Sequence, residues 1–443
     1  MGLAAPAQSS ARWRLALFAA GDFAFNLYWQ SVMLYLLFYY TEAIHLPIAV
    51  ASICYAVASA WDGIVSLAVG VLADRYAKPE QFRRALTFGA LPLGLSFIFA
   101  YLPPPMAGLG GLIWVIGGHL LFRSAYALVN VPYLAMSARI SLDSRERALV
   151  AGGRMLCGTI AAVIVALGTV PLGRWLTGSD GPSAYAASAA AFAVLATVLL
   201  VLVGATYRDG AIPAALPSSS IGRSIMLALR NRAFLTLSAA VMAMIVAVTV
   251  LDKSVLYYFK YALGDEHAGQ LALGWMMAVS GLAIPAWMLV SRYVGIRGTW
   301  FAGVLACIAC LLVFVMGGLQ QPLTVQVYLV AIQGSTVGLH YAFWALLPDT
   351  VEWGQRQTGV RSEAVLYGMA ALLQRLAIGA GTLLVGYGLG REGLHHSAAG
   401  DAAYRMVLAV IPLGFLTLAG LLMLANPLRR GSHDRIVAEL TGS

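Results

Sequence analysis

The stretch SAWDGIVSLAVGVLADR, residues 59–75, places one aspartate, Asp62, inside an otherwise apolar run. The run begins near Pro47 and is long enough to cross the hydrocarbon core of a bilayer as a helix. A charged side chain is costly in hydrocarbon, so an intramembrane aspartate indicates a functional group that has a partner. The stretch therefore predicts a membrane span that carries a working carboxylate.

Apolar runs of similar length recur along the whole chain of 443 residues, of which 60% are hydrophobic and 11% are charged. A soluble globular chain carries about 25% charged residues. The composition therefore predicts an all-α integral membrane protein with twelve transmembrane helices in two pseudo-symmetric six-helix bundles. The spans are expected at 15–40, 47–73, 85–103, 109–137, 149–172, 182–205, 233–259, 267–291, 298–318, 323–348, 362–388 and 402–425. The first ten residues lack signal-peptide features, so the first run is expected to be a true span.

The net charge of +9 is distributed according to topology. If both termini face the cytoplasm, the opposite side holds only Arg174, Lys260, Arg391 and Arg405. This asymmetry follows the positive-inside rule. It indicates a multi-pass protein of a bacterial-type inner membrane, with lipid headgroups rather than nucleic acid as partners. The four cysteines fall within predicted spans without a second ligand pair, which favours buried apolar residues over a metal site.

The chain is expected to divide at a segment rich in Pro, Gly and Ser. Residues 1–207 form one bundle, 208–224 a cytoplasmic linker, and 225–443 a second bundle with a short cytoplasmic tail. The halves echo each other weakly, because ARISLDSRERALVAGGR leads to Arg154 and LLPDTVEWGQRQTGVRSEA precedes Arg375. Two six-helix halves with weak similarity are typical of transporters that rock around a central site.

Three predicted spans carry polar stripes at helical spacing, and such stripes face a cavity or one another rather than lipid. The other ionisable intramembrane residues are Asp62, Arg154, Asp252, Lys253 and Arg375. Each intramembrane ionisable residue, His340 included, could instead have a purely structural role, either as a charge paired between helices or as a buried imidazole with its hydrogen bonds satisfied. The stripes consist of Asp22, Asn26, Trp29 and Gln30 in the first span; Arg123, Tyr126, Asn130, Tyr133 and Ser137 in the fourth; and Gln333, Thr336, His340 and Trp344 in the tenth.

Several segments of the chain resemble known proteins, at the level of a superfamily and at the level of a family within it. GVLADRYAKPEQFRR (70–84) resembles the major facilitator superfamily motif, in which Asp74 and Arg75 would stabilise one conformation; the alternative is a solvated charged turn. A more specific resemblance is carried by segments 21–46, 61–75, 130–155 and 349–381, with YYFKYALGD (257–265) as a shorter echo. In these segments the chain resembles the glycoside–pentoside–hexuronide:cation symporter family, the melibiose permease branch of that superfamily.

The resemblance implies a cation site built from spans 1, 2 and 4, with sugar bound nearby. Asp22 and Asp62 match two acids of the family, whereas Ser66 and Asn130 stand where the melibiose permease has acids. An aromatic residue that stacks on sugar in that permease is Leu134 here. Arg154 and Arg375 match basic residues of the family's spans 5 and 11.

These departures favour proton coupling. Sodium gains from two nearby carboxylates that offset the cost of desolvation. A single carboxylate in hydrocarbon favours taking up a proton, because its charged form is the costly one. Sodium coupling through Ser66 and backbone oxygens, and uniport, stay open at this point. No cofactor beyond the coupling ion, H⁺ or Na⁺, is expected.

The expected function is cation-coupled import of a sugar, glycoside or sugar acid by a monomer that is not an enzyme. The substrate-binding candidates are Asp22, Asn26, Trp29, Gln30, Arg123, Tyr133, Arg154, Asp252, Lys253, His340, Trp344 and Arg375. A lysolipid or amphiphile transporter of the same fold and a transport-inactive sensor are the alternatives. An ATP-driven pump is disfavoured, because the chain has no GxxxxGK[ST] phosphate loop.

Overall fold

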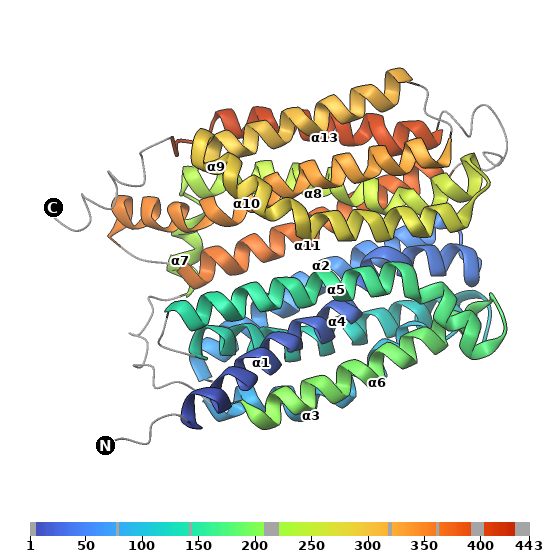
Figure 1. Cartoon of the computed structure of the whole chain (residues 1–443), viewed down its shortest axis with the longest axis horizontal. Helices are drawn as coiled ribbons and strands as arrows, with labels where there is room; N and C mark the ends of the chain where they lie inside the picture. The colour runs from blue at the N-terminus through green and yellow to red at the C-terminus, as the bar shows by residue number, and fades with distance from the viewer. Residues whose placement is uncertain are drawn as a thin grey trace. The chain divides into compact units, whose positions relative to one another are not determined.

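The computed structural model describes residues 6–76, 79–140, 144–207, 221–317, 321–359, 363–390 and 403–429, and each of these segments is largely helical (Figure 1). The chain divides into two compact units, Met1–Ala214 and Ala215–Ser443. The division falls within the predicted linker 208–224, of which 208–220 lie outside the described residues.

The first unit is built from six long helices. Helix α1 packs against α5 and α6, α3 packs against α4 and α6, and α2 packs against α4. The described elements are α1 (Pro6–Ser31), the π-helical segments η1 (Val32–Leu36) and η2 (Tyr39–Ala43), α2 (Ile48–Tyr76), α3 (Pro79–Ala100), α4 (Gly108–Arg139), α5 (Ser144–Thr177) and α6 (Pro182–Thr206).

In the second unit, α9 comprises two helical halves that correspond to the predicted spans 267–291 and 298–318. A kink at Gly295 separates the halves, and its φ of 75° and ψ of 167° suit a residue without a side chain. Helix α9 packs against α10, and α8 packs against α11 and α13. The described elements are α7 (Ile221–Ala228), α8 (Arg232–Tyr257), η3 (Tyr258–Ala262), α9 (Glu266–Gly317), α10 (Pro322–Thr358), α11 (Glu363–Leu389), η4 (Met406–Val410) and α13 (Ile411–Leu424).

Helices occupy all twelve predicted span positions. Ten helices in the described part of the chain are long and apolar enough to cross a membrane, when α9 is counted once. Of the long helices in the described residues, α1 is outside that count, and it carries the polar stripe of the first span. Large apolar side chains such as Phe88, Leu282 and Met316 are 74%, 77% and 84% exposed, as expected for a surface in contact with lipid.

The first long helix of each unit leads into a π-helical turn. η2 follows α1 and has the sequence YYTEA, whereas η3 follows α8 and has the sequence YFKYA. The turns close in the same way, because Ile44 N–H donates to the Tyr39 carbonyl and Leu263 N–H donates to the Tyr258 carbonyl. π-Helical turns are rare, so their occurrence at matching positions supports the weak internal repeat.

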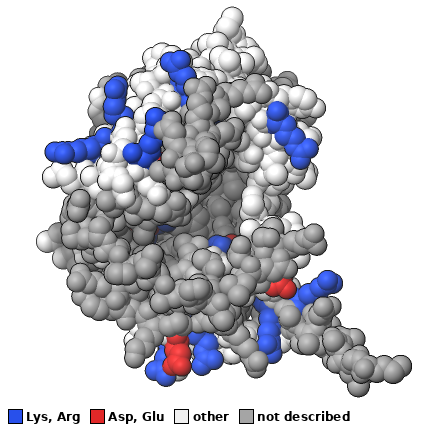
Figure 2. Space-filling model, turned by 90° about the vertical axis from the view of Figure 1, so that its left-hand side faces the viewer, with Lys and Arg blue, Asp and Glu red and all other residues white. Residues whose placement is uncertain are grey.

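Basic side chains gather at the helix ends. Figure 2 views the side on which α1 begins, and among the described residues there Lys and Arg predominate over Asp and Glu. This distribution agrees with the positive-inside pattern of the sequence. The orientation of both termini toward the cytoplasm stays a prediction.

Candidate functional site

Asp62 lies on α2 and forms a fully buried ion pair with Arg123 of α4. Its Oδ2 is 3.1 Å from Nη1 of Arg123, and the two side chains are 0% and 1% exposed. Ser66, one turn further along α2, donates its hydroxyl to Oδ1 of Asp62 at 3.3 Å. The guanidinium neutralises the carboxylate, so Asp62 is a paired charge between helices, the structural alternative that the sequence left open.

Arg123 joins three elements of the first unit. Its Nε donates to Nε2 of His119 at 3.2 Å, and its Nη2 donates to the hydroxyl of Tyr55 at 3.4 Å. Its guanidinium carbon also lies 5.0 Å from the ring of Trp29 on α1, a cation–π contact. A buried guanidinium needs acceptors for its N–H groups, and these contacts supply them together with Asp62.

A second ion pair joins α1 and α5. Nε of Arg154 is 2.7 Å from Oδ2 of Asp22, and Nη2 is 3.3 Å from Oδ1, so the guanidinium binds both carboxylate oxygens. The Asp22 and Arg154 side chains are 16% and 19% exposed, so this pair is more accessible than the first. Asn26 donates its amide to the Asp22 carbonyl, and the Tyr133 ring lies 5.3 Å from the Arg154 guanidinium.

Two glycines permit this close packing. A Cβ on Gly21 would lie 2.7 Å from the ring of Tyr133, and a Cβ on Gly158 would lie 2.9 Å from the amide nitrogen of Asn26. Tyr133 is itself fixed, because it is fully buried and its hydroxyl donates to the Phe18 carbonyl at 2.8 Å. The position of the second ion pair thus depends on small residues in α1 and α5.

Aromatic rings connect the surroundings of the two ion pairs. Phe25 packs against Tyr126 and Tyr133, with ring centroids 5.7 and 4.9 Å apart. Trp29 lies against Tyr126 at 5.9 Å while its ring also contacts Arg123. The first unit therefore brings the predicted residues of spans 1, 2, 4 and 5 into one buried polar and aromatic layer.

Other predicted residues of the first unit are less closely associated with this layer. Gln30 and Asn130 are partly buried, and within the described residues no hydrogen bond joins Asn130 to Asp62 or Ser66. Asp74 and Arg75 fall in the last turns of α2, and their side chains lie outside the described residues.

The second unit places its candidates on three helices. Lys253 on α8 is buried, whereas its neighbour Asp252 is partly buried, and Oδ1 of Asp252 lacks a hydrogen-bond partner within the described segments. Nδ1 of His340 on α10 lies 3.1 Å from the Thr336 carbonyl, so the imidazole is satisfied within its own helix. Trp344 of α10 is 54% exposed, and Arg375 of α11 is partly buried.

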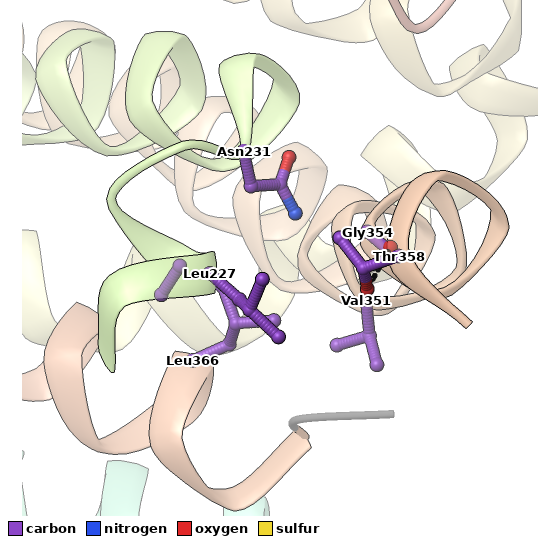
Figure 3. A pocket seen from close by; sticks show the side chains of 7 residues that line it. Leu227, Asn231, Val351, Gly354, Thr358 and Leu366 are labelled. Carbon is purple, nitrogen blue, oxygen red and sulfur yellow. Dashed lines mark hydrogen bonds between the residues drawn. The ribbon is translucent and has the colours of Figure 1, made fainter. Parts of the chain in front are cut away.

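A small hollow in the second unit does not suit a substrate. Figure 3 shows Asn231 at the start of α8 facing α10, where its amide donates to the Thr350 carbonyl at 2.7 Å. The hollow has a volume of about 10 Å³, comparable to the space that one water molecule needs. It is lined by Leu227, Ala228, Asn231, Val351, Gly354, Thr358 and Leu366.

His119 is, with Tyr55 and Phe25, one of the residues of this site that were not predicted from the sequence. It lies on α4 one turn before Arg123 and is 0% exposed. The available signal was its position inside the predicted span 109–137 at i, i+4 spacing from an intramembrane arginine. It belongs with the intramembrane ionisable residues.

Comparisons with known proteins define the class. The chain matches a family model described as MFS/sugar transport protein over residues 17–430. Inner membrane symporter YicJ of Escherichia coli (strain K12) is 24% identical over 400 residues, which cover 89% of this chain and 85% of that protein. The glucuronide carrier protein homolog of the same organism is 24% identical over 441 residues, covering 97% and 95%. The crystal structure of nucleoside transporter NupG has a TM-score of 0.63 at 14% identity, covering 94% of this chain and 99% of NupG.

The fold and the matches identify a multi-pass membrane transporter with the major facilitator fold. The chain belongs to the MFS/sugar transport protein family. The predicted resemblance to the glycoside–pentoside–hexuronide:cation symporters is confirmed by this match and by its relatives.

Proposed function

We propose that this transporter imports a sugar, glycoside or sugar acid together with a proton by alternating access. The observation that carries the proposal is the fully buried Asp62–Arg123 pair in a chain of a sugar transport family. A buried pair is costly to desolvate and weak as a source of stability, so its placement in a span favours a functional role. Relatives named as a glycoside/cation symporter and a glucuronide carrier support the substrate class.

The surroundings of Asp62 favour a proton over sodium. The carboxylate already has a guanidinium that supplies the positive charge, and Ser66 supplies the neighbouring oxygen. Sodium at this carboxylate would have to displace Arg123 without a second carboxylate to offset the dehydration of the ion. Proton transfer needs only a titrating group and a change in the pairing of Arg123.

The Asp22–Arg154 pair is the proposed sugar-binding element. Two hydrogen bonds hold the Arg154 guanidinium against the Asp22 carboxylate. In this arrangement the carboxylate can accept from sugar hydroxyls, and the guanidinium can donate to hydroxyls or to the carboxylate of a sugar acid. Both side chains are partly exposed, in contrast to Asp62 and Arg123. Trp29, which is partly buried, offers a face for stacking on a sugar ring.

The remaining features of the proposal come from the sequence. We expect the protein to act as a monomer in a bacterial-type inner membrane, with both termini in the cytoplasm. Substrate contacts from the second unit are assigned to Asp252, Lys253, His340, Trp344 and Arg375. The coupling ion, rather than a resident cofactor, completes the cycle.

The test is uptake by purified protein in proteoliposomes, with a proton gradient or a sodium gradient imposed separately. The probes are a labelled neutral glycoside and a labelled glucuronide. Proton-driven accumulation of either one supports the proposal, and its loss in Asp22→Asn supports the sugar-binding role. Accumulation driven by sodium alone would refute proton coupling, and uptake of neither probe under any gradient would refute the substrate class.

A further inference from the structure

The hydrogen bond between Arg123 and His119 fixes the protonation state of a buried histidine. Arg123 carries only donors, so Nε2 of His119 must be the acceptor of the 3.2 Å contact from Nε. An imidazole that accepts at Nε2 is neutral and carries its proton on Nδ1. In the structure, His119 is therefore neutral, and its acceptor nitrogen is used by the same arginine that neutralises Asp62.

Protonation of His119 is incompatible with this arrangement. A proton on Nε2 turns that nitrogen into a donor, which would face the N–H of Arg123 at hydrogen-bond distance. The two groups would also carry like charges in a site that is 0–1% exposed, where water does not screen them. The Nε and Nη1 groups belong to one planar guanidinium, so movement of Nε away from His119 also moves Nη1 away from Asp62.

Asp62 is the counter-ion of Arg123 in this state. If Asp62 took the proton, Arg123 would be left buried beside neutral groups alone, which is the unfavourable arrangement for a buried charge. In water, imidazole binds a proton more tightly than a carboxylate does. The imidazole is thus the alternative acceptor for a proton that reaches this cluster.

We propose that His119 is a proton-binding residue of this transporter, and that its protonation releases Arg123 from Asp62. The inference rests on the proposed function and deepens it, because it separates the group that binds the proton first from the carboxylate that is freed. The proton is added to Nε2, the Arg123–His119 hydrogen bond is lost, and no covalent bond changes. Loss of that proton restores the pair.

The groups around the imidazole come from three elements. Arg123 faces it from α4 itself, and Tyr55 of α2 packs against its ring at 5.2 Å. Tyr40 of η2 also packs against the imidazole, with its ring centroid 6.1 Å from that of His119. Asp62 of α2 is the acidic group that faces it through Arg123. Arginine is thus the charged group in direct contact, and its displacement is the expected response to a proton.

Trp29 provides a readout that needs no substrate. Its ring lies 5.0 Å from the Arg123 guanidinium, so movement of that charge changes the indole environment. The chain has 10 tryptophans, and the difference in emission between the full-length protein and Trp29→Phe isolates this one. We expect the Trp29 emission to titrate with pH in the unmodified protein and to lose that titration in His119→Gln.

The variants are matched to keep this result decisive. Glutamine retains an acceptor for Arg123 but does not titrate, and His119→Asn serves if the glutamine variant does not fold. His267→Gln replaces an exposed histidine of α9 and should leave the titration unchanged. Titration of Trp29 in His119→Gln that equals the unmodified protein, or no titration in the unmodified protein, would overturn the inference.

Transport separates this inference from the proposed function. In proteoliposomes, His119→Gln should still exchange labelled substrate across the membrane but lose its proton-driven accumulation. Equal proton-driven accumulation by the variant and the unmodified protein would overturn the role of His119 alone. An absence of sugar uptake in the unmodified protein, with the Trp29 titration intact, would overturn the proposed function alone.

Discussion

Replacement of Asp62 by asparagine should lower the free energy of unfolding by about 3–5 kcal/mol, because it removes one partner of a buried ion pair. Arg123 is 1% exposed, so water cannot replace the lost carboxylate. Its other hydrogen-bond partners, His119 and Tyr55, are neutral acceptors at 3.2 and 3.4 Å. They satisfy N–H groups but leave the charge uncompensated.

The paired replacement separates charge from packing. Asp62→Asn combined with Arg123→Gln removes both charges, so the double variant should be more stable than Asp62→Asn alone. The double-mutant cycle gives the interaction energy between the two positions. The assay is denaturant unfolding of the purified variants in detergent micelles.

An exposed ion pair provides the control. Arg84 and Glu80 approach to 3.9 Å with side chains that are 68% and 81% exposed, so Glu80→Gln should cause no measurable change. The reasoning is refuted if Asp62→Asn is as stable as the unmodified protein. It is also refuted if the double variant is no more stable than that single variant.

Two further predictions concern packing. Gly21→Ala should lower the free energy of unfolding by about 1–3 kcal/mol, because its Cβ would lie 2.7 Å from Tyr133; thermal unfolding should show no comparable loss in Gly414→Ala, which has open space. Arg297→Ala should lower it by about 1.5–3 kcal/mol, because the guanidinium donates to four carbonyls at the end of α13 and just beyond it, at 2.7–3.2 Å. In denaturant unfolding, the stability of Arg297→Lys should lie between that of Arg297→Ala and that of the unmodified protein, since an ammonium cannot reproduce the planar arrangement of guanidinium donors. Equal stability of Arg297→Ala and the unmodified protein would contradict this account.

The helices were predictable from the sequence because span length and hydropathy are local properties. The polar stripe of span 1 also placed Asp22, Asn26 and Trp29 correctly on α1. Pairing was not predictable in the same way. Asp22 and Arg154 are 132 residues apart, and Asp62 and Arg123 are 61 apart, so their contact depends on how each helix is rotated and at what depth it lies.

The break between spans 8 and 9 falls within the predicted gap between residues 291 and 298, but the φ of 75° at Gly295 that makes it is not reported by hydropathy. The role of His119 depended on the direction of one hydrogen bond from Arg123. Both features require coordinates, because the sequence gives residue types and spacing but no torsion angles or donor geometry. The i, i+4 spacing of His119 and Arg123 is visible in the sequence, so the same pair can be sought in related chains.

Charge balance within the first unit has a consequence for energetics in a polarised membrane. The Asp22–Arg154 and Asp62–Arg123 pairs each sum to zero, so these positions contribute no net charge when the carrier is empty. Moving one elementary charge through the full field is worth about 2.3 kcal/mol per 100 mV. As far as these four residues are concerned, we therefore expect the membrane potential to affect the step in which the carrier moves with its bound cation. The step in which the empty carrier returns should not depend on voltage.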